Sequence, residues 1–156
     1  MSSVQLYRLV HTKWASQAFD GEGARLYGGR WNSKGQRCIY TAGSEALAIL
    51  EILVHLNNRA ALTQFRLFQL NIAKQDLLRI DLSKLPDSWQ AQPATADTAR
   101  IGDDWLAKQA SLALSVPSVL APREHNILLN PQHPKFSQCL SNITELDFIP
   151  DLRLTL

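Results

Sequence analysis

The sequence is poor in cysteine, and its two cysteines lie far apart. Cys38 and Cys139, among 156 residues, form neither a metal-ligand spacing nor a disulfide framework, so a reducing cytoplasm is the expected setting. Long hydrophobic runs are also missing, because no stretch approaches the roughly 20 apolar residues of a membrane span. The first residues, MSSVQLYRLVHTKW, lack the apolar run of a signal peptide. We therefore expect a cytoplasmic protein that does not enter a membrane.

Charge of either sign is sparse and evenly spread. Sixteen Lys and Arg against 14 Asp and Glu give a net charge of +2, and the cations form no long basic run. This pattern argues against direct binding of nucleic acid, although a local site for an anion remains compatible with it. A hydrophobic content of 46% fits one globular domain over residues 1–156 with a substantial core.

Hydrophobic patterns predict several short strands and two main helices. The clearest helix follows Ser44, a favourable N-cap residue, over residues 45–58. Because this helix is apolar on nearly all sides, we expect it to be buried on nearly all sides. A second helix is expected over residues 95–109, where Gly102 weakens the pattern.

The strand pattern is shorter and more scattered. Strands are expected at residues 4–10, 38–40, 64–72, 77–82 and 143–149, and as short pieces between residues 112 and 136. The hydrophobic phase slips near Phe68, which predicts a bulge in the strand over 64–72. The resulting fold class is α+β, with a central, mostly antiparallel sheet or sandwich and flanking helices.

Glycine and arginine are concentrated in one segment. Five of the seven glycines lie between Gly21 and Gly35, and Arg25, Arg30, Lys34 and Arg37 lie in or beside the same segment. Glycine allows close approach of another molecule to the backbone, and the guanidinium group suits phosphate oxygens. The segment is therefore either a loop that binds an anionic ligand such as a nucleotide, or a solvated surface turn.

Glu51 is the only charged residue between Ala46 and Val54, in the most apolar helix of the chain. A carboxylate in such a place needs a partner, or its pKa should rise. Arg8, Arg25 and Arg30 are candidate partners. A structural Glu–Arg pair or a contact with His55, four residues later, competes with a catalytic role.

Ser118 follows an apolar strand in the tripeptide Val-Pro-Ser. The chain has neither a Gly-x-Ser-x-Gly elbow nor a Ser-x-x-Lys arrangement, so a hydroxyl that orients a ligand fits better than a nucleophile. A turn-stabilising hydroxyl is the alternative. Asn126 offers a carboxamide for a ligand or a loop, and Tyr7, Tyr27 and Tyr40 offer rings for stacking or packing. The histidines lack the spacing of a metal pair, so no metal is expected.

These motifs occur in an order that resembles the RES domain, named for Arg, Glu and Ser, the toxin half of bacterial RES–Xre toxin–antitoxin pairs. Tyr7-Arg8 is followed by Gly28-Gly29-Arg30-Trp31-Asn32, then Tyr40, then Glu51 in Leu-Glu-Ile-Leu-Val-His, then Val116-Pro117-Ser118, and finally Asn126 through Asn130-Pro131. The resemblance extends over essentially the whole chain. It implies a core similar to that of ADP-ribosyltransferase toxins and activity on NAD as a substrate, without a cofactor.

The resemblance also implies roles for individual residues. Arg30, Glu51 and Ser118 would be the catalytic trio, and NAD would be bound by residues of the glycine-rich segment and its neighbours, namely Arg8, Arg25, Tyr27, Gly28, Gly29, Tyr40 and Asn126. The implied activity is cleavage of the nicotinamide–ribose bond, as an NAD phosphorylase or glycohydrolase. ADP-ribosylation of a protein and non-catalytic nucleotide binding are the alternatives. An Xre-family helical DNA-binding antitoxin is the implied partner, inorganic phosphate a candidate acceptor, and a homodimer a candidate assembly.

Overall fold

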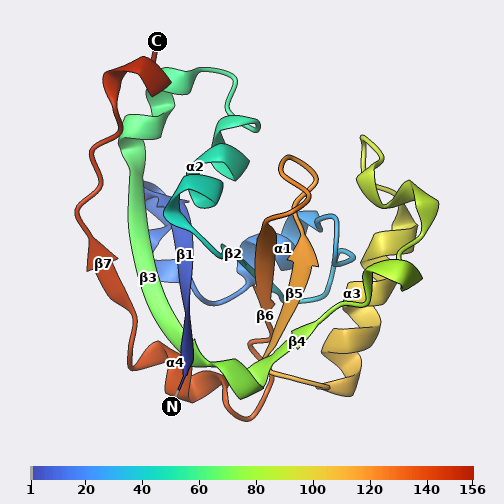
Figure 1. Cartoon of the computed structure of the whole chain (residues 1–156). Helices are drawn as coiled ribbons and strands as arrows, with labels where there is room; N and C mark the ends of the chain where they lie inside the picture. Colours follow the sequence, from blue (N-terminus) through green and yellow to red (C-terminus); the bar gives the residue numbers. More distant parts are fainter. Residues whose placement is uncertain (1) are drawn as a thin grey trace.

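A seven-stranded sheet is the centre of the computed structural model, which describes residues 2–156 (Figure 1). The strands are β1 (Ser3–His11), β2 (Ile39–Ala42), β3 (Phe65–Ala73), β4 (Leu77–Arg79), β5 (Ala113–Pro117), β6 (His125–Leu129) and β7 (Thr144–Leu146). In space they follow the order β4-β5-β6-β2-β1-β3-β7. Among the described strands, β4 and β5 are parallel and the other neighbouring pairs are antiparallel. The expected α+β fold with a mostly antiparallel sheet is confirmed.

Strands β1 and β3 pair along their full lengths in an unbroken register, so the predicted bulge near Phe68 is wrong. Leu67 and Phe68 are both buried, although successive side chains point to opposite faces of a strand. Leu67 belongs to a hydrophobic cluster with Leu47, whereas Phe68 packs edge-on against Phe19. A strand that is covered on both faces loses its alternation of apolar and polar residues. The apparent slip in the hydrophobic pattern near Phe68 therefore results from coverage of β3 on both faces.

Helix α2 (Glu45–Leu53) begins where the sequence predicts. The Ser44 hydroxyl caps it by accepting a hydrogen bond from the backbone N–H of Leu47 at 3.1 Å. The helix ends before residue 58, and its described residues bury one face against β1 and β2. Leu50 and, just beyond the helix, Val54 are 39% and 51% exposed. The expectation of burial on nearly all sides is therefore wrong, because a helix at the edge of the fold covers the sheet with one face only.

Helix α3 (Ala96–Lys108) lies on the side of the molecule where β4 and β5 end the sheet (Figure 1). Gly102 is buried in this helix, and a Cβ atom added there would overlap the carbonyl oxygen of Trp31. The Asp103 carboxylate accepts hydrogen bonds from the backbone N–H and hydroxyl of Ser33, at 2.9 and 2.5 Å. The glycine that weakens the helical pattern therefore allows α3 to pack against the glycine-rich segment.

The remaining elements depart from the sequence prediction mainly in length. The glycine-rich segment contains a short helix, α1 (Glu22–Tyr27), and another short helix, α4 (Phe136–Leu140), follows the last central strand. Strands β4 and β7 are each shorter than predicted, whereas β5 and β6 confirm the short strands expected between residues 112 and 136. Within residues 2–156, the longest apolar helical stretch falls short of what would be needed to cross a bilayer.

Candidate active site

A cleft of about 720 Å³ opens beside the glycine-rich segment. Its walls come from β1, α1, β2, α2 and the ends of β5 and β6, which are distant in sequence. Of the residues selected from the sequence, eight line this cleft, namely Arg8, Tyr27, Gly28, Gly29, Arg30, Tyr40, Glu51 and Asn126. Ser118 lies directly behind the wall, between the lining residues Pro117 and Val119. The fold therefore gathers these polar groups around one cavity.

The Glu51 carboxylate is held by two side-chain donors. The Ser118 hydroxyl donates to Glu51 Oε1 at 2.8 Å, and the Asn126 carboxamide donates to the same oxygen at 3.1 Å. Ser118 is fully buried, and its hydroxyl accepts from the backbone N–H groups of Leu120 and Ala121. The Ser118 proton is thereby directed at Glu51, and the carboxylate is fixed in one orientation toward the cleft.

This arrangement separates the alternatives for Glu51. Within residues 2–156, Glu51 takes part in no ion pair and its hydrogen-bond partners are Ser118 and Asn126. The predicted Glu–Arg pair and the predicted contact with His55 are therefore both absent from this described part of the chain. A half-buried carboxylate with one oxygen held and the cleft in front of it is available to a ligand.

Arg8 places a half-buried positive charge in the wall of the cleft. Its Nε donates to the carbonyl of Ala18 and its Nη1 to the carbonyl of Tyr40, both at 2.7 Å. Burial lowers the pKa of Arg8 to about 10, so the side chain is still charged at neutral pH. Carbonyl groups satisfy its hydrogen bonds but do not neutralise its charge, which favours an anionic ligand at this wall.

Arg30 is held by a segment that follows it in the chain by about sixty residues. Its Nη1 donates to the carbonyl oxygens of Trp89 and Ala91, both at 2.9 Å and at separations of 59 and 61 residues. Desolvation lowers the pKa of Arg30, and the nearby Glu51 charge opposes this shift. The two cationic residues Arg8 and Arg30 thus border the cleft that contains Glu51.

Tyr40 organises the glycine-rich segment through its hydroxyl. The hydroxyl donates to Asn32 Oδ1 at 2.6 Å and accepts from the backbone N–H of Trp31 at 3.1 Å. The Asn32 carboxamide in turn donates to the carbonyls of Ala24 and Gln36. A Cβ added at Gly29 would lie 2.6 Å from the Tyr40 hydroxyl. The glycine therefore allows the segment to close over Tyr40, whose own pKa is raised by burial.

We predict that Tyr40→Phe destabilises the protein by about 1–3 kcal/mol, because it leaves the Trp31 N–H and the Asn32 carbonyl oxygen without their partner. Urea unfolding followed by tryptophan fluorescence measures this loss. Tyr27→Phe is the matched control, since Tyr27 is 77% exposed. Loss of its hydroxyl should leave the free energy of unfolding within about 0.5 kcal/mol of the wild-type value. Equal stability of the two variants would contradict the role of Tyr40.

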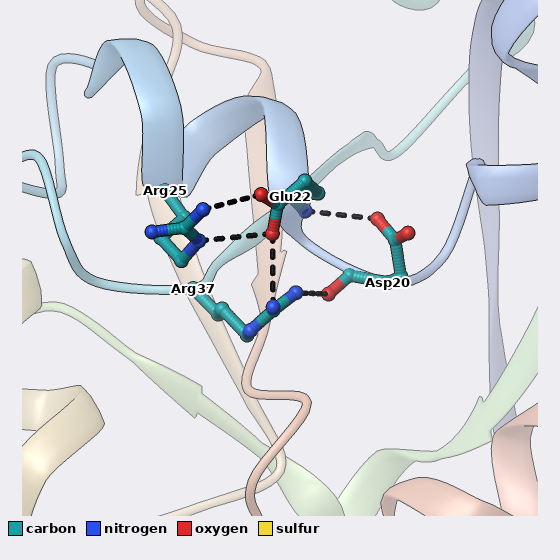
Figure 2. Close-up of polar contacts among 4 residues, drawn as sticks. All are labelled: Asp20, Glu22, Arg25 and Arg37. Carbon is teal, nitrogen blue, oxygen red and sulfur yellow. Dashed lines mark hydrogen bonds and ion pairs between the residues drawn. The ribbon is translucent and has the colours of Figure 1, made fainter.

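Arg25 lies outside the lining of the cleft and is engaged by Glu22, as Figure 2 shows. The Arg25 guanidinium makes a two-pronged contact with Glu22, at 2.9 and 2.5 Å, and Arg37 adds a further ion pair at 2.9 Å. Arg37 also donates to the carbonyl of Asp20. Arg25 is thus bound within α1, whereas Arg30 borders the cavity. The spacing of Glu22 and Arg25, three residues apart on a helix, is the sequence signal for this pairing.

Gln92, Ala94 and His55 are among the further residues that line the cleft without having been predicted as site residues. Gln92 and Ala94 belong to the connection that precedes α3, which reads as an ordinary loop. Its contact with Arg30 holds it beside the cleft, and local sequence holds no signal for a contact between residues about sixty positions apart. His55 follows Glu51 by four residues, which is a helical spacing in the sequence, but it lies beyond the end of α2 in the structure.

Cys38 also lines the cleft, but its chemistry is suppressed by burial. Burial raises the pKa of the Cys38 thiol from 9.0 to about 12, so that at pH 8 about one thiol in ten thousand is ionised. Because the folded pKa lies above the unfolded value, the thiol stabilises the fold below pH 9. This contribution is lost as the pH rises from about 9 toward 12.

We predict that iodoacetamide at pH 8 leaves Cys38 unmodified in the native protein, during a time in which the urea-unfolded protein is fully alkylated. Mass spectrometry of the digested protein measures the extent of labelling. Labelling of Cys38 in the native state at the unfolded rate would show that its thiol is accessible and ionised, contrary to its position in the structure.

The described residues, 2–156, contain no group of three or more His, Cys, Asp and Glu side chains placed to hold a metal ion. The polar atoms around the cleft instead include the fixed Glu51 carboxylate, carboxamides, guanidinium groups, the backbone of a glycine-rich turn and the carboxylates of Asp20 and Glu22. This set is suited to an organic ligand that carries both anionic groups and hydroxyl or amide groups.

The fold and this cleft define a small α+β protein in which the Glu51 carboxylate is held in place by two side-chain donors at the cavity. The family model described as the RES domain matches residues 5–154, and the chain belongs to this family. The expectation of a RES-domain toxin is confirmed at this level by relatives that match over nearly their full lengths.

Three similar proteins illustrate the relationship. "Toxin Res" of Yersinia enterocolitica is 44% identical over 97% of this chain and 99% of the relative, and "Toxin Res" of Photorhabdus laumondii is 39% identical over 96% of both. The "Prs ADP-ribosylating toxin" of a Sphingobium species is 38% identical over 73% of each chain. Among solved structures, the M. tuberculosis MbcT–MbcA toxin–antitoxin complex matches with a TM-score of 0.71. It has 20% identity over 97% of this chain and 87% of that one, which supports the fold alone.

Proposed function

We propose that this RES-domain toxin consumes NAD by cleaving the bond between nicotinamide and ribose, and thereby inhibits growth. The observation that carries the proposal is the Glu51 carboxylate, held by Ser118 and Asn126 at a cleft that is bordered by Arg8 and Arg30. NAD carries a pyrophosphate, hydroxyl groups and a carboxamide, which correspond in kind to the groups around the cleft. NAD acts here as the substrate, and the reaction needs no cofactor or metal.

Glu51 would act on the charge that develops during cleavage. As the bond between ribose C1′ and the nicotinamide nitrogen breaks, its electron pair leaves with neutral nicotinamide and the ribose gains positive, oxocarbenium-like charge. A carboxylate that is already oriented stabilises this charge without reorganising. An oxygen of water then bonds to C1′ and releases its proton to the solvent, or a deprotonated oxygen of inorganic phosphate bonds to C1′ without loss of a proton. Ser118 would position Glu51 from behind and would not itself contact the reacting atoms.

The pyrophosphate would be bound by the cationic side of the cleft. Arg8 and Arg30 supply positive charge, and the glycine-rich turn at Gly28 and Gly29 lines the same cleft. Tyr27, exposed beside these glycines, would offer its ring for stacking on a base. Arg25 is already engaged by Glu22, so we assign the main cationic contacts to Arg8 and Arg30.

ADP-ribosylation of a protein target is the second candidate function. It is favoured by the name of the Sphingobium relative, an ADP-ribosylating toxin with 38% identity. The same carboxylate and the same cleavage of the glycosidic bond serve this reaction, and only the acceptor differs. The third candidate, a nucleotide-binding module without catalysis, would retain the ligand and release no product.

The partner that we propose is a helical, DNA-binding antitoxin of the Xre family. Two observations support an antitoxin: the structural match is to a toxin–antitoxin complex, and α2 leaves Leu50 and the adjoining Val54 exposed next to the cleft wall. A partner that covers apolar residues beside the cavity would block access to it. Within such a complex we propose that two copies of the toxin associate, and that the activity is exerted in the cytoplasm.

A time course of NAD consumption by the purified toxin, free of any antitoxin, tests the proposed function. Nicotinamide release with ADP-ribose as the second product indicates hydrolysis, and ADP-ribose 1″-phosphate formed only with added phosphate indicates phosphorolysis. Intact NAD under both conditions, with labelling of a lysate protein by biotinylated NAD, would replace this proposal with ADP-ribosylation of a protein. Binding of NAD without formation of any product would support the third candidate, a nucleotide-binding module without catalysis.

A further inference from the structure

The connection that precedes α3, residues 86–94, is fastened to the molecule at two separate points. Near its N-terminal end, the Ser88 hydroxyl donates to the Asp97 carboxylate at 2.8 Å and contacts the Thr95 hydroxyl at 3.3 Å, both at the start of α3. In its middle, the carbonyls of Trp89 and Ala91 both accept from Arg30 Nη1 at 2.9 Å. A segment held by a side chain at one point and by backbone carbonyls at the other loses much of the freedom of an ordinary loop.

The base to which this segment is fastened is itself rigid. Arg30 precedes Trp31, whose carbonyl packs directly against Gly102 of α3, and Ser33 is bonded to Asp103 of the same helix. Helix α3, the glycine-rich segment and residues 86–94 are therefore connected in a closed circuit of contacts. A side chain placed on such a frame keeps its position relative to Glu51, which lies across the same cleft.

The side chain that this frame presents to the cleft is Gln92. Gln92 lines the cavity together with Ala94, and it directly follows Ala91, whose carbonyl Arg30 holds. The Gln92 side chain is exposed at the cleft, and its carboxamide makes no hydrogen bond to any of the residues that the structure describes. A carboxamide both donates and accepts, so it can pair with an amide, a ring nitrogen or a hydroxyl of a ligand.

We infer that Gln92 binds the dinucleotide by hydrogen bonding and that Arg30 is the residue that positions it. This inference rests on the proposed function and adds a specificity-determining residue to the site. Arg30 then has two roles, because its charge faces the cleft while its Nη1 hydrogen bonds fix the segment that carries Gln92. The group of NAD that pairs with the Gln92 carboxamide lies either on the adenylate half or on the nicotinamide half.

Steady-state kinetics with NAD test the contact of Gln92. Gln92→Ala is expected to raise KM about three- to tenfold with kcat within about twofold, which is the loss of one hydrogen bond to bound substrate. Gln90→Ala is the matched control, since Gln90 lies exposed in the same segment and outside the lining of the cleft. Both variants should unfold at the same temperature as the wild type. Wild-type KM in Gln92→Ala would overturn the inference.

Nicotinamide mononucleotide, which lacks the adenylate half, identifies the partner group. If Gln92→Ala raises KM for NAD and leaves that for the mononucleotide unchanged, Gln92 binds the adenylate half. An equal rise for both substrates places its partner on the nicotinamide ribosyl half. Either result supports a contact with the substrate, and unchanged KM for both contradicts it.

A double-mutant cycle tests the positioning role of Arg30. The lysine ammonium group lies closer to the main chain than Arg Nη1 and lacks the planar fork of donors, so Arg30→Lys should release the segment. In the Arg30→Lys background, Gln92→Ala is then expected to change KM by less than twofold. The same fold-change in both backgrounds would show that Arg30 does not position Gln92.

If the wild type leaves NAD intact, the proposed function fails. If the wild type consumes NAD and Gln92→Ala behaves like Gln90→Ala, this inference alone fails.

Discussion

The Glu51→Gln variant is expected to consume NAD about 10²–10³-fold more slowly than the wild type, while its free energy of unfolding changes by less than about 1 kcal/mol. Glutamine retains an oxygen that can accept from both Ser118 and Asn126, so the wall of the cleft should survive. What it removes is the negative charge that would stabilise the oxocarbenium-like ribose. The rate of nicotinamide release at saturating NAD measures the effect.

Glu45→Gln is the matched control for this variant. Glu45 lies exposed in the first turn of the same helix, so its neutralisation should leave the rate unchanged and reduce stability by only a few tenths of a kcal/mol. A Glu51→Gln protein that releases nicotinamide within threefold of the wild-type rate would show that Glu51 is not catalytic. Labelling of a protein target should fall in parallel if the acceptor is a protein, because cleavage of the same bond precedes both outcomes.

The Gly102→Ala variant is expected to lose about 3 kcal/mol or more of stability. An added Cβ would overlap the carbonyl oxygen of Trp31, which is main chain and cannot rotate away. The helix must therefore move from the glycine-rich segment, which would also separate Asp103 from Ser33. Urea unfolding of the variant and the wild type gives the difference in free energy.

Gly23→Ala provides the comparison for this effect. Gly23 lies in α1, and an added Cβ there meets no heavy atom within 4 Å. Alanine in a helix loses less backbone entropy on folding than glycine, so this variant should be as stable as the wild type or more stable by about 0.5–1 kcal/mol. If Gly102→Ala and Gly23→Ala unfold at the same urea concentration, the close packing of α3 on Trp31 is not what stabilises this part of the fold.

The sequence was most informative where local chemistry decides the structure. Ser44 caps α2 as its side chain predicts, and the short apolar runs after residue 112 form β5 and β6. Prediction failed where contacts between residues far apart in the sequence determine the structure. The slip near Phe68 reflects coverage of β3 on both faces. Leu50 and Val54 are exposed because no other element within residues 2–156 covers their side of α2. The composition of the helix does not indicate which of its faces the rest of the fold covers.

The same distinction applies to the candidate site. Glu51 stands out in the sequence because a lone carboxylate in an apolar helix requires an explanation, and the structure supplies Ser118 and Asn126 as its partners. The contact of Arg30 with residues 89–91 spans about sixty residues, so no local pattern indicates it. The engagement of Arg25 by Glu22 follows a helical spacing that is visible in the sequence only once α1 is known to be a helix.

The strand order has a consequence for when the candidate site is assembled during synthesis of the chain. Strand β6 lies between β2 and β5, so it joins the early strands to the later ones, and it also carries Asn126 to Glu51. A ribosome-bound chain that has not yet released residues 125–129 lacks both the central strand and one of the two donors that fix the carboxylate. The candidate site is therefore completed only after residues 125–129 have emerged and β6 has taken its place between β2 and β5.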